Sequence, residues 1–311
     1  MPTSAPAPTD VRDTLRELRG ADFAYFMGTG NAGDALINVA AMQLFSTLGL
    51  RPRFLNYRSA GVPEGGVLVC SGGGNFVSMY HNLANFVRKH HRSAKRLIVL
   101  PHSYSGHEAL LRELGPNVLL MCREPRSFDY LNGLGLRAEV ELSEDVALNL
   151  DPATVLRGQP LAPEDRGSVW RREAWRDRLK YAVRSAAYLR TSPRDPETGR
   201  RSLLAYRDDA ERTEAPLPSN NCDASVVFSS RDGYYLPDSA LRSTRALLGF
   251  LNHFDDIFTN RLHVAIAALL LGKDVHIAPN NYHKLESIYR FSLKHRFPKA
   301  HWEAADDARP D

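Results

Sequence analysis

The sequence predicts two open α/β domains that face each other across a cleft. Short apolar runs, typical of buried strands, alternate with longer helical runs along most of the 311 residues, and this alternation favours parallel sheets. The length suits two domains of ordinary size. Glycine-rich or polar turns follow several predicted strands, and ligands bind at that end of open parallel sheets.

The composition is that of a globular protein, with 43% hydrophobic residues and a net charge of +4. No apolar run approaches the roughly 18 residues that span a bilayer, and nothing in the charge pattern indicates a nucleic-acid partner. The 3 cysteines are widely spaced and form no C-x-x-C pair. We therefore expect neither a disulfide framework nor a zinc site, and a reducing cytoplasm fits.

The predicted organisation has five segments. Residues 1–20 are expected to form a disordered leader rather than a signal peptide. Residues 21–165 form an N-terminal domain, residues 166–200 a basic linker, residues 201–297 a C-terminal domain and residues 298–311 a tail. The N-terminal domain has predicted strands at 22–27, 53–57, 67–70, 96–100, 118–122 and 139–142, with helices at about 35–48 and 78–91 and another opening near Ser127.

Glycine-rich turns follow the first and third predicted strands. The first, at residues 28–34, reads formally as G-x-G-x-x-G, but the second strand ends in Asn56, Tyr57 and Arg58 and lacks the acidic residue that holds the ribose of NAD. Asp34 would also repel a pyrophosphate, so a dinucleotide cofactor is disfavoured. The second turn, at residues 71–75, lets Asn75 bind ligand hydroxyls, although simple packing of helix on strand explains three glycines about as well.

The linker contains one strongly basic segment. Eight Lys or Arg and two acidic residues between positions 166 and 190 give a local net charge of +6. On a helical period, one face is apolar and Lys180 and Arg184 lie opposite; the apolar residues are Trp175, Leu179, Ala182, Val183, Ala186 and Leu189. This pattern suits a helix on an anionic membrane surface. An ordinary interdomain helix with a solvated basic face is the somewhat favoured alternative.

The C-terminal domain continues the alternation. Strands are predicted at residues 202–206, 257–258 and 275–278, and helices at 236–252, 262–272 and 285–294, while 223–230 is ambiguous. Thr259 or Asn260 is the expected N-cap of the helix that starts near residue 262. Arg261 and His263 then lie in its first turn, where the helix dipole favours an anion rather than a cation. A bound phosphate or carboxylate would explain them, and a surface ion pair with a partly buried histidine is an equal alternative.

Four motifs resemble those of the polysaccharide pyruvyl transferase family. They are the turn at residues 30–34, the turn at 72–75, Arg123-Glu-x-x-Ser127 followed by Asp145-Val-Ala, and Arg261-Leu-His263 with Ala265, Ala268 and Gly272 behind it. The last is the most specific. The sequence departs from the family pattern at Glu124, where Asp is usual, and at residues 102–104, where glycines are common.

The resemblance implies two Rossmann-like domains in a GT-B-like arrangement, with the donor held by the C-terminal domain. It implies transfer of the pyruvyl group of phosphoenolpyruvate to sugar hydroxyls, commonly as a ketal, in a cell-surface or exopolysaccharide precursor. On this interpretation His263 is the general acid/base, Arg261 clamps the donor anion and Arg123 stabilises departing phosphate. Further expected donor contacts are Arg207, Asn260 and Lys284, and expected acceptor contacts are Asn31, Asp34, Asn75 and His102.

No cofactor or metal is expected beyond phosphoenolpyruvate as donor substrate. The interpretation leaves open whether the sugar acceptor is lipid-linked, and whether the protein is purely cytoplasmic or also peripheral at the membrane through residues 166–190. Two other classes remain: a nucleotide-sugar glycosyltransferase of the same architecture, and a non-catalytic polysaccharide assembly protein. Binding of phosphoenolpyruvate rather than a UDP-sugar would distinguish a pyruvyl transferase from the glycosyltransferase. Loss of activity on substituting His263 would distinguish it from the non-catalytic protein.

Overall fold

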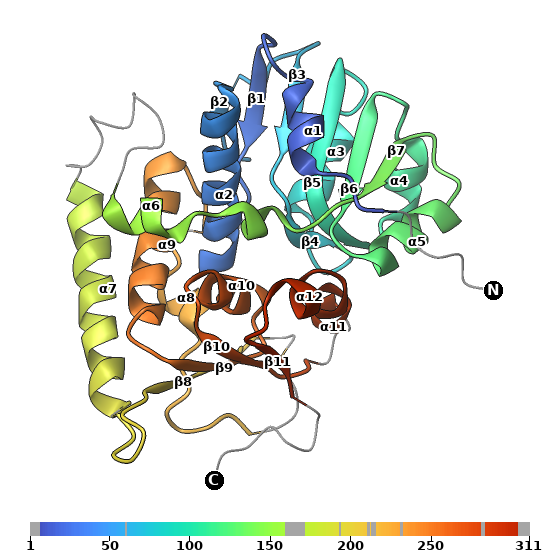
Figure 1. The fold of residues 1–311 in the computed structure, drawn as a ribbon. Helices are drawn as coiled ribbons and strands as arrows, with labels where there is room; N and C mark the ends of the chain where they lie inside the picture. Colours follow the sequence, from blue (N-terminus) through green and yellow to red (C-terminus); the bar gives the residue numbers. More distant parts are fainter. Residues whose placement is uncertain are drawn as a thin grey trace. The chain divides into compact units, whose positions relative to one another are not determined.

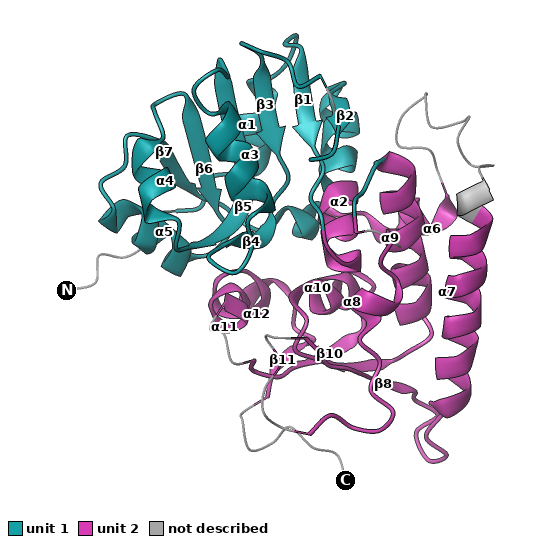
Figure 2. Ribbon diagram, turned by 180° about the vertical axis from the view of Figure 1, so that it is seen from behind, with its two compact units in different colours: residues 1–29, 40–149, 234–236 teal, residues 30–39, 150–233, 237–311 magenta. Residues whose placement is uncertain are grey.

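The computed structural model describes residues 7–59, 61–158, 172–192, 194–209, 212, 216–230, 233–280 and 284–303 (Figure 1). It is an α/β fold with two parallel sheets, as predicted. The chain divides into two compact units, coloured in Figure 2. Unit 1 comprises residues 1–29, 40–149 and 234–236, and unit 2 comprises residues 30–39, 150–233 and 237–311. The facing of two domains across a cleft stays a prediction.

Among the described residues, the sheet of unit 1 has seven strands, all parallel. Its order is β2-β1-β3-β5-β6-β7, and β4 pairs with β5 outside this path. The strands are β1 (Phe23–Phe26), β2 (Arg53–Leu55), β3 (Val67–Cys70), β4 (Gly73–Val77), β5 (Arg96–Ser105), β6 (Val118–Cys122) and β7 (Glu139–Leu142). The strand order reverses between β1 and β3, which makes the carboxyl ends of these two strands a topological switch point.

Helices cover this sheet because its strands are apolar on both faces; every residue of β1 and β6 is buried. The helices that lie wholly in unit 1 are α1 (Val11–Arg16), α3 (Asn82–His90), α4 (Glu108–Glu113), α5 (Pro125–Gly133) and the 3-10 turn η1 (Val146–Asn149). Helix α2 (Ala32–Leu48) contributes its first eight residues to unit 2 and the rest to unit 1. Aromatic contacts such as Phe26 on Phe86, with ring centroids 4.1 Å apart, fill the core.

The sheet of unit 2 has four parallel strands in the order β11-β10-β9-β8. They are β8 (Ser202–Ala205), β9 (Asp256–Thr259), β10 (Asp274–Ile277) and β11 (Ala300–Trp302). Burial alternates along β9 and β10, so one sheet face is fully covered and the other only partly. Figure 1 draws α8, α10 and α12 on the same side of this sheet.

The helices of unit 2 vary widely in length. They are α6 (Pro152–Arg157), α7 (Arg172–Thr191), α8 (Ala224–Val227), α9 (Pro237–Leu251), α10 (Leu262–Leu270), α11 (Lys284–Ile288) and α12 (Lys294–Arg296), with a π-helical segment, Tyr289–Leu293, between the last two. Helix α10 is the most apolar of these, and six of its nine residues are fully buried or nearly so. Its first turn therefore has a fixed position, because the rest of the helix is enclosed in the core of unit 2.

Four expectations about local structure are wrong. Within the expected leader, Asp10 caps α1 and Leu15 is buried, so residues 11–16 are folded. The expected glycine turn at 71–75 instead contains the start of strand β4, which ends at Val77. Strand β5 runs five residues past its expected end at Leu100, and the expected tail contains β11. In the last three cases the backbone pairs with a neighbouring strand, although the side chains there do not have the apolar pattern that predicts a strand.

All three cysteines are buried and free of disulfides. Burial raises the pKa of Cys70 and Cys122 far above the ordinary value of a thiol. It also raises the pKa of Cys222, to about 12. Among the described residues, no helix combines the length and apolar character that crossing a bilayer requires.

Candidate functional site

Polar side chains cluster at the switch point of unit 1. Thr29 follows β1, Asn75 lies in β4 and Asn82 opens α3. The Asn75 amide donates to the Thr29 carbonyl oxygen at 3.5 Å, and the Asn82 amide donates to the Thr29 hydroxyl at 3.4 Å. The predicted acceptor residue Asn75 is therefore part of a hydrogen-bonded group, in which Thr29 and Asn82 were not anticipated from the sequence.

His102 orients Asn75. The His102 Nε2 atom lies 2.8 Å from the Asn75 side-chain oxygen and 3.1 Å from the Asn75 backbone nitrogen. His102 is 1% exposed, and it belongs to the extension of β5 that pairs with Gly73 of β4. Its imidazole therefore supports the position of Asn75 from within the sheet, and Asn75 is the more accessible of the two residues.

Arg123 forms a buried ion pair. Its guanidinium contacts the Asp145 carboxylate at 2.8 Å and donates from Nε to the Ser103 hydroxyl at 2.8 Å. Both charged side chains are nearly inaccessible, at 5% and 1% exposure. Next to it, Glu124 caps α5 through the Ser127 backbone N–H. The motif Arg123-Glu-x-x-Ser127 thus ties the ends of β5 and β6 and the loop after β7 into one buried network, and a direct catalytic role for Arg123 stays a prediction.

The turn before α2 is a reciprocal cap. The Asn31 side-chain oxygen accepts from the Gly33 N–H at 2.8 Å, and the Asp34 carboxylate accepts from the Asn31 N–H at 2.9 Å. Gly30 has φ 138°, and a Cβ there would lie 2.2 Å from an Asp34 oxygen. Asn31 and Asp34, both predicted acceptor residues, are thus held in defined positions by the turn, and α2 starts three residues earlier than expected.

His263 lies against this turn. A Cβ on Gly33 would stand 2.7 Å from His263 Nδ1 and 2.9 Å from His263 Cβ. Both residues belong to unit 2, and only a residue without a side chain allows this approach. The structure therefore brings a predicted general acid/base together with the turn that carries two predicted acceptor residues.

Arg261 is the N-cap residue of α10, so the cap lies one or two positions later than the predicted Thr259 or Asn260. The Thr259 hydroxyl accepts from the Arg261 N–H at 3.0 Å. Arg261 is 5% exposed, and its guanidinium contacts two carboxylates: Asp223 through Nε at 3.1 Å and also through NH2, and Asp209 through NH1 at 2.8 Å. The negative charge expected beside Arg261 at this helix terminus is thus supplied, in this structure, by the carboxylates of Asp209 and Asp223.

Arg207 shares one of these carboxylates. It contacts Asp209 through Nε at 2.8 Å and through NH2 at 3.1 Å. A single carboxylate thus bridges two guanidinium groups that follow the neighbouring strands β8 and β9. The predicted donor residue Asn260 holds this arrangement, because its side-chain oxygen accepts from the Arg207 backbone N–H at 2.7 Å. Lys284, the last predicted donor residue, opens α11 and is half-buried.

The charges of this cluster are balanced. Burial alone would lower the pKa of Arg261, but the hydrogen bond and negative charge of Asp223, together with Asp209, raise it above its usual value. Arg261 therefore stays protonated, and two arginines face two aspartates. Asp223 is 10% exposed, whereas Asp209 is 36% exposed and is the more accessible acid.

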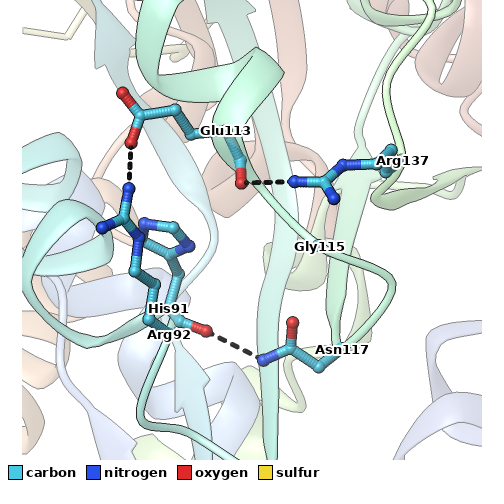
Figure 3. A pocket seen from close by; sticks show the side chains of 6 residues that line it. All are labelled: His91, Arg92, Glu113, Gly115, Asn117 and Arg137. Atoms are coloured by element: carbon cyan, nitrogen blue, oxygen red, sulfur yellow. Dashed lines mark hydrogen bonds and ion pairs between the residues drawn. The ribbon is translucent and has the colours of Figure 1, made fainter.

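A separate hollow of about 300 Å³ lies in unit 1, lined by His91, Arg92, Glu113, Gly115, Asn117 and Arg137 (Figure 3). These residues precede β5, β6 and β7, so the hollow is at the amino ends of the strands. Its groups are joined to one another, with Arg92 on Glu113 at 2.9 Å and Asn117 on the His91 carbonyl oxygen at 2.8 Å. Ligands of open parallel sheets bind at the opposite edge, so the hollow is not the candidate site. In the part of the chain that is described, no cluster of metal-binding side chains is present.

Two parallel-sheet units with polar and charged side chains at the carboxyl ends of their strands define an α/β ligand-binding protein. Residues 31–281 match the family model of polysaccharide pyruvyl transferase. Because the match covers more than half of the chain, the protein belongs to the polysaccharide pyruvyl transferase family, and this membership implies a pyruvyl transferase activity.

One crystal structure with a similar fold is that of a functionally uncharacterised protein from Klebsiella pneumoniae subsp. pneumoniae. It is 26% identical, with a TM-score of 0.70, and the alignment covers 96% of this chain and 100% of the other. A search of curated proteins gives no match. The likeness therefore supports the fold over nearly the whole chain without adding a substrate.

Proposed function

We propose that the protein transfers the pyruvyl group of phosphoenolpyruvate to two hydroxyls of a sugar and forms a ketal on a cell-surface or exopolysaccharide precursor. The observation that carries this proposal is the position of His263, which lies in the first turn of α10 against Gly33, two residues after the N-cap Arg261. A proton-transferring group thus lies two residues after Arg261, which together with Arg207 contacts the carboxylate of Asp209.

Asp209 indicates how the donor would bind. Its carboxylate contacts Arg207 and Arg261 at 2.8 Å each, and two such guanidinium groups also suit the carboxylate or phosphate of phosphoenolpyruvate. Because Asp209 is the more accessible of the two acids, a donor anion would compete with it for the arginines. Asp223 would keep Arg261 oriented during this exchange, and Lys284 is a further candidate cation.

The chemistry requires one proton to be delivered and two to be removed. The first hydroxyl oxygen bonds to C2 of the enol while the methylene carbon takes a proton and becomes a methyl group. The second hydroxyl oxygen then bonds to C2 as the C2–O bond to phosphate breaks, and inorganic phosphate leaves with the second hydroxyl proton. An imidazole can both give and take a proton near neutral pH, so His263 is the proposed general acid/base.

Asn31 and Asp34 are the proposed acceptor contacts of unit 2, and Asn75, oriented by His102, is proposed separately to bind sugar hydroxyls at unit 1. Amide groups donate and accept hydrogen bonds, and carboxylates accept them, in fixed directions, so both suit sugar hydroxyls. Asn31 and Asp34 are held by the cap before α2, and Asn75 is held by His102 and Thr29. Held side chains of this kind bind without a large loss of conformational freedom.

The test of the donor is a binding measurement. Phosphoenolpyruvate should raise the melting temperature of the protein, and a UDP-sugar should not. In extracts of candidate glycans, labelled phosphoenolpyruvate should pass its carbon skeleton to a glycan with release of phosphate. His263→Gln should lower this transfer by about 10²–10⁴-fold, whereas His253→Gln, on an exposed residue after α9, should leave it unchanged. Stabilisation by a UDP-sugar instead would identify a glycosyltransferase and overturn the proposal.

A further inference from the structure

The outward face of α7 carries a stripe of exposed apolar side chains. Trp175, Leu179 and Val183 follow one another at four-residue intervals and are 54%, 55% and 59% exposed. Ala182 and Ala186 lie on the same face and are exposed as well. Large apolar side chains are seldom left in water in a contiguous row unless they bind something.

The opposite face of α7 packs on the rest of unit 2, and these contacts keep the apolar stripe facing outward. The Tyr181 hydroxyl donates to the Ser229 carbonyl oxygen at 3.0 Å, and the Lys180 ammonium donates to the same oxygen at 3.2 Å. Tyr188 packs on Phe250 of α9, with ring centroids 6.3 Å apart. Figures 1 and 2 both draw α7 alongside α9. The helix cannot roll its apolar stripe inward without losing these contacts.

Among the described side chains of α7, the exposed charged ones are all positive. They belong to Arg176, Arg178, Arg184 and Arg190. The described acid of the helix, Asp177, faces Arg242 of α9 at 3.7 Å. At 100° per residue, Arg176 and Arg178 fall on the two sides of the stripe. An apolar band between flanking arginines is the arrangement of a helix that lies in the headgroup region of an anionic bilayer.

We propose that α7 holds unit 2 on the surface of a membrane that contains anionic lipid, with Trp175, Leu179 and Val183 inserted at the interface and the flanking Arg176 and Arg178 bound to headgroup phosphates. Charge favours this occupant over a second copy of the chain. Two such helices related by a twofold axis would bring arginines together with no exposed described acid of α7 to match them. Membrane binding would place the enzyme near an acceptor that is itself attached to lipid.

The experiment is flotation of the full-length protein with vesicles of phosphatidylcholine, with or without phosphatidylglycerol, and with no substrate present. We expect the protein to float with the anionic vesicles and not with the neutral ones, and salt should weaken its binding. The fluorescence of Trp175 should shift to the blue, and Trp175→Phe should remove that shift. The combined variant Trp175→Ser, Leu179→Ser and Val183→Ser should reduce binding at least about tenfold.

Charge is tested separately by Arg176→Gln with Arg178→Gln, which should reduce binding by about an order of magnitude or more. The matched controls are Met79→Ser and Leu236→Ser, exposed apolar residues elsewhere that are 55% and 46% exposed, and they should bind like the parent. Equal flotation of parent and stripe variant would overturn the proposal. The proposal would also be overturned if the protein did not bind lipid and formed a dimer that the stripe substitutions dissociate. Because no substrate is used, neither result depends on the transferase proposal.

Discussion

The position of His263 depends on the absence of a side chain at Gly33. In Gly33→Ala, the added methyl group would stand 2.7 Å from His263 Nδ1, so the imidazole must move or the turn must open. We expect a loss of stability of about 1–3 kcal/mol and at least a tenfold loss of pyruvyl transfer, because displacement of about 1 Å strongly affects an acid/base group.

Gly249→Ala is the matched control for this substitution. Gly249 lies inside α9 with nothing within 4 Å of its Cβ position. Alanine there should raise stability by up to about 1 kcal/mol and leave activity unchanged. Stability is read from urea unfolding and activity from phosphate release. Normal activity in Gly33→Ala would show that the contact with His263 has no part in the reaction.

Asp209 neutralises the two arginines proposed to bind the donor. In Asp209→Asn, the cluster of Arg207, Arg261 and Asp223 gains a net positive charge, and a bound anion no longer displaces a carboxylate. We therefore expect the KM for phosphoenolpyruvate to fall several-fold at low ionic strength, with a smaller difference at high salt. Asp208→Asn is the control, since Asp208 is 59% exposed and pairs with Arg212. A raised KM in Asp209→Asn would instead make Asp209 part of the donor site.

At the scale of elements, the start of α2 depends on the cap formed by Asn31. Asn31→Ala removes the acceptor for the Gly33 N–H, and this should cost about 0.5–2 kcal/mol of stability. Asn31→Asp keeps an acceptor at the same place and should retain most of that stability. If Asn31 also binds the sugar, the Asp variant will be stable yet will have a changed KM for the acceptor. Urea unfolding and acceptor kinetics on the two variants separate the two roles.

The sequence predicted some elements with the observed bounds. The strands at 67–70, 118–122 and 139–142 agree with β3, β6 and β7, because the first two are short apolar runs, the third alternates charged and apolar residues, and each is followed by a polar residue. Strand β4 was missed because its first two residues are glycines, and it forms through pairing with β5. The N-terminal helix was missed because the Pro-rich composition before it extended a prediction of disorder past the cap at Asp10.

The sequence also located part of the candidate site. The polar residues before the apolar run of α10 placed Arg261 and His263 at its first turn, and the structure agrees to within two residues. Local pattern did not reveal that Asp209 and Asp223 hold Arg261, because both lie far earlier in the sequence, in segments where the residue pattern predicts neither a strand nor a helix. Nor could it reveal the contact between Gly33 and His263, which joins residues 230 positions apart. Such contacts depend on the fold of unit 2 as a whole.

At the scale of the whole molecule, Glu141 and Glu139 in β7 should shape the pH dependence of stability. Burial, with the nearby Glu139 carboxylate, raises the pKa of Glu141, and one of its oxygens is buried without a hydrogen bond. A carboxyl with a raised folded pKa stabilises fully below its unfolded pKa and loses that contribution as pH rises through the folded value. The pKa of Glu139 is lowered by its hydrogen bond to Arg96, so its contribution has the opposite sign.

We therefore expect Glu141→Gln to be more stable than the parent at neutral pH, because it removes a charge from a partly buried position. The advantage should disappear near about pH 3, which is below the unfolded pKa of a Glu side chain, because the parent carboxyl is then protonated in both states. Glu139→Gln should instead lose stability at neutral pH, by no more than about 1 kcal/mol because the Glu139 side chain is 51% exposed and solvent screens the pair. Urea midpoints at the two pH values test both statements. An advantage of Glu141→Gln that does not change with pH would contradict the assignment.

The buried cysteines offer a way to follow the unfolding of each unit. Cys70 and Cys122 belong to unit 1 and Cys222 belongs to unit 2, and all three thiols are protonated in the native protein at neutral pH. A thiol-specific alkylating reagent should therefore modify none of them until the surrounding unit opens. Pulse labelling at increasing urea concentrations, followed by peptide mapping, would then give the urea concentration at which each unit opens. Simultaneous modification of all three would identify one cooperative transition, and earlier modification of Cys222 would identify unit 2 as the first to open.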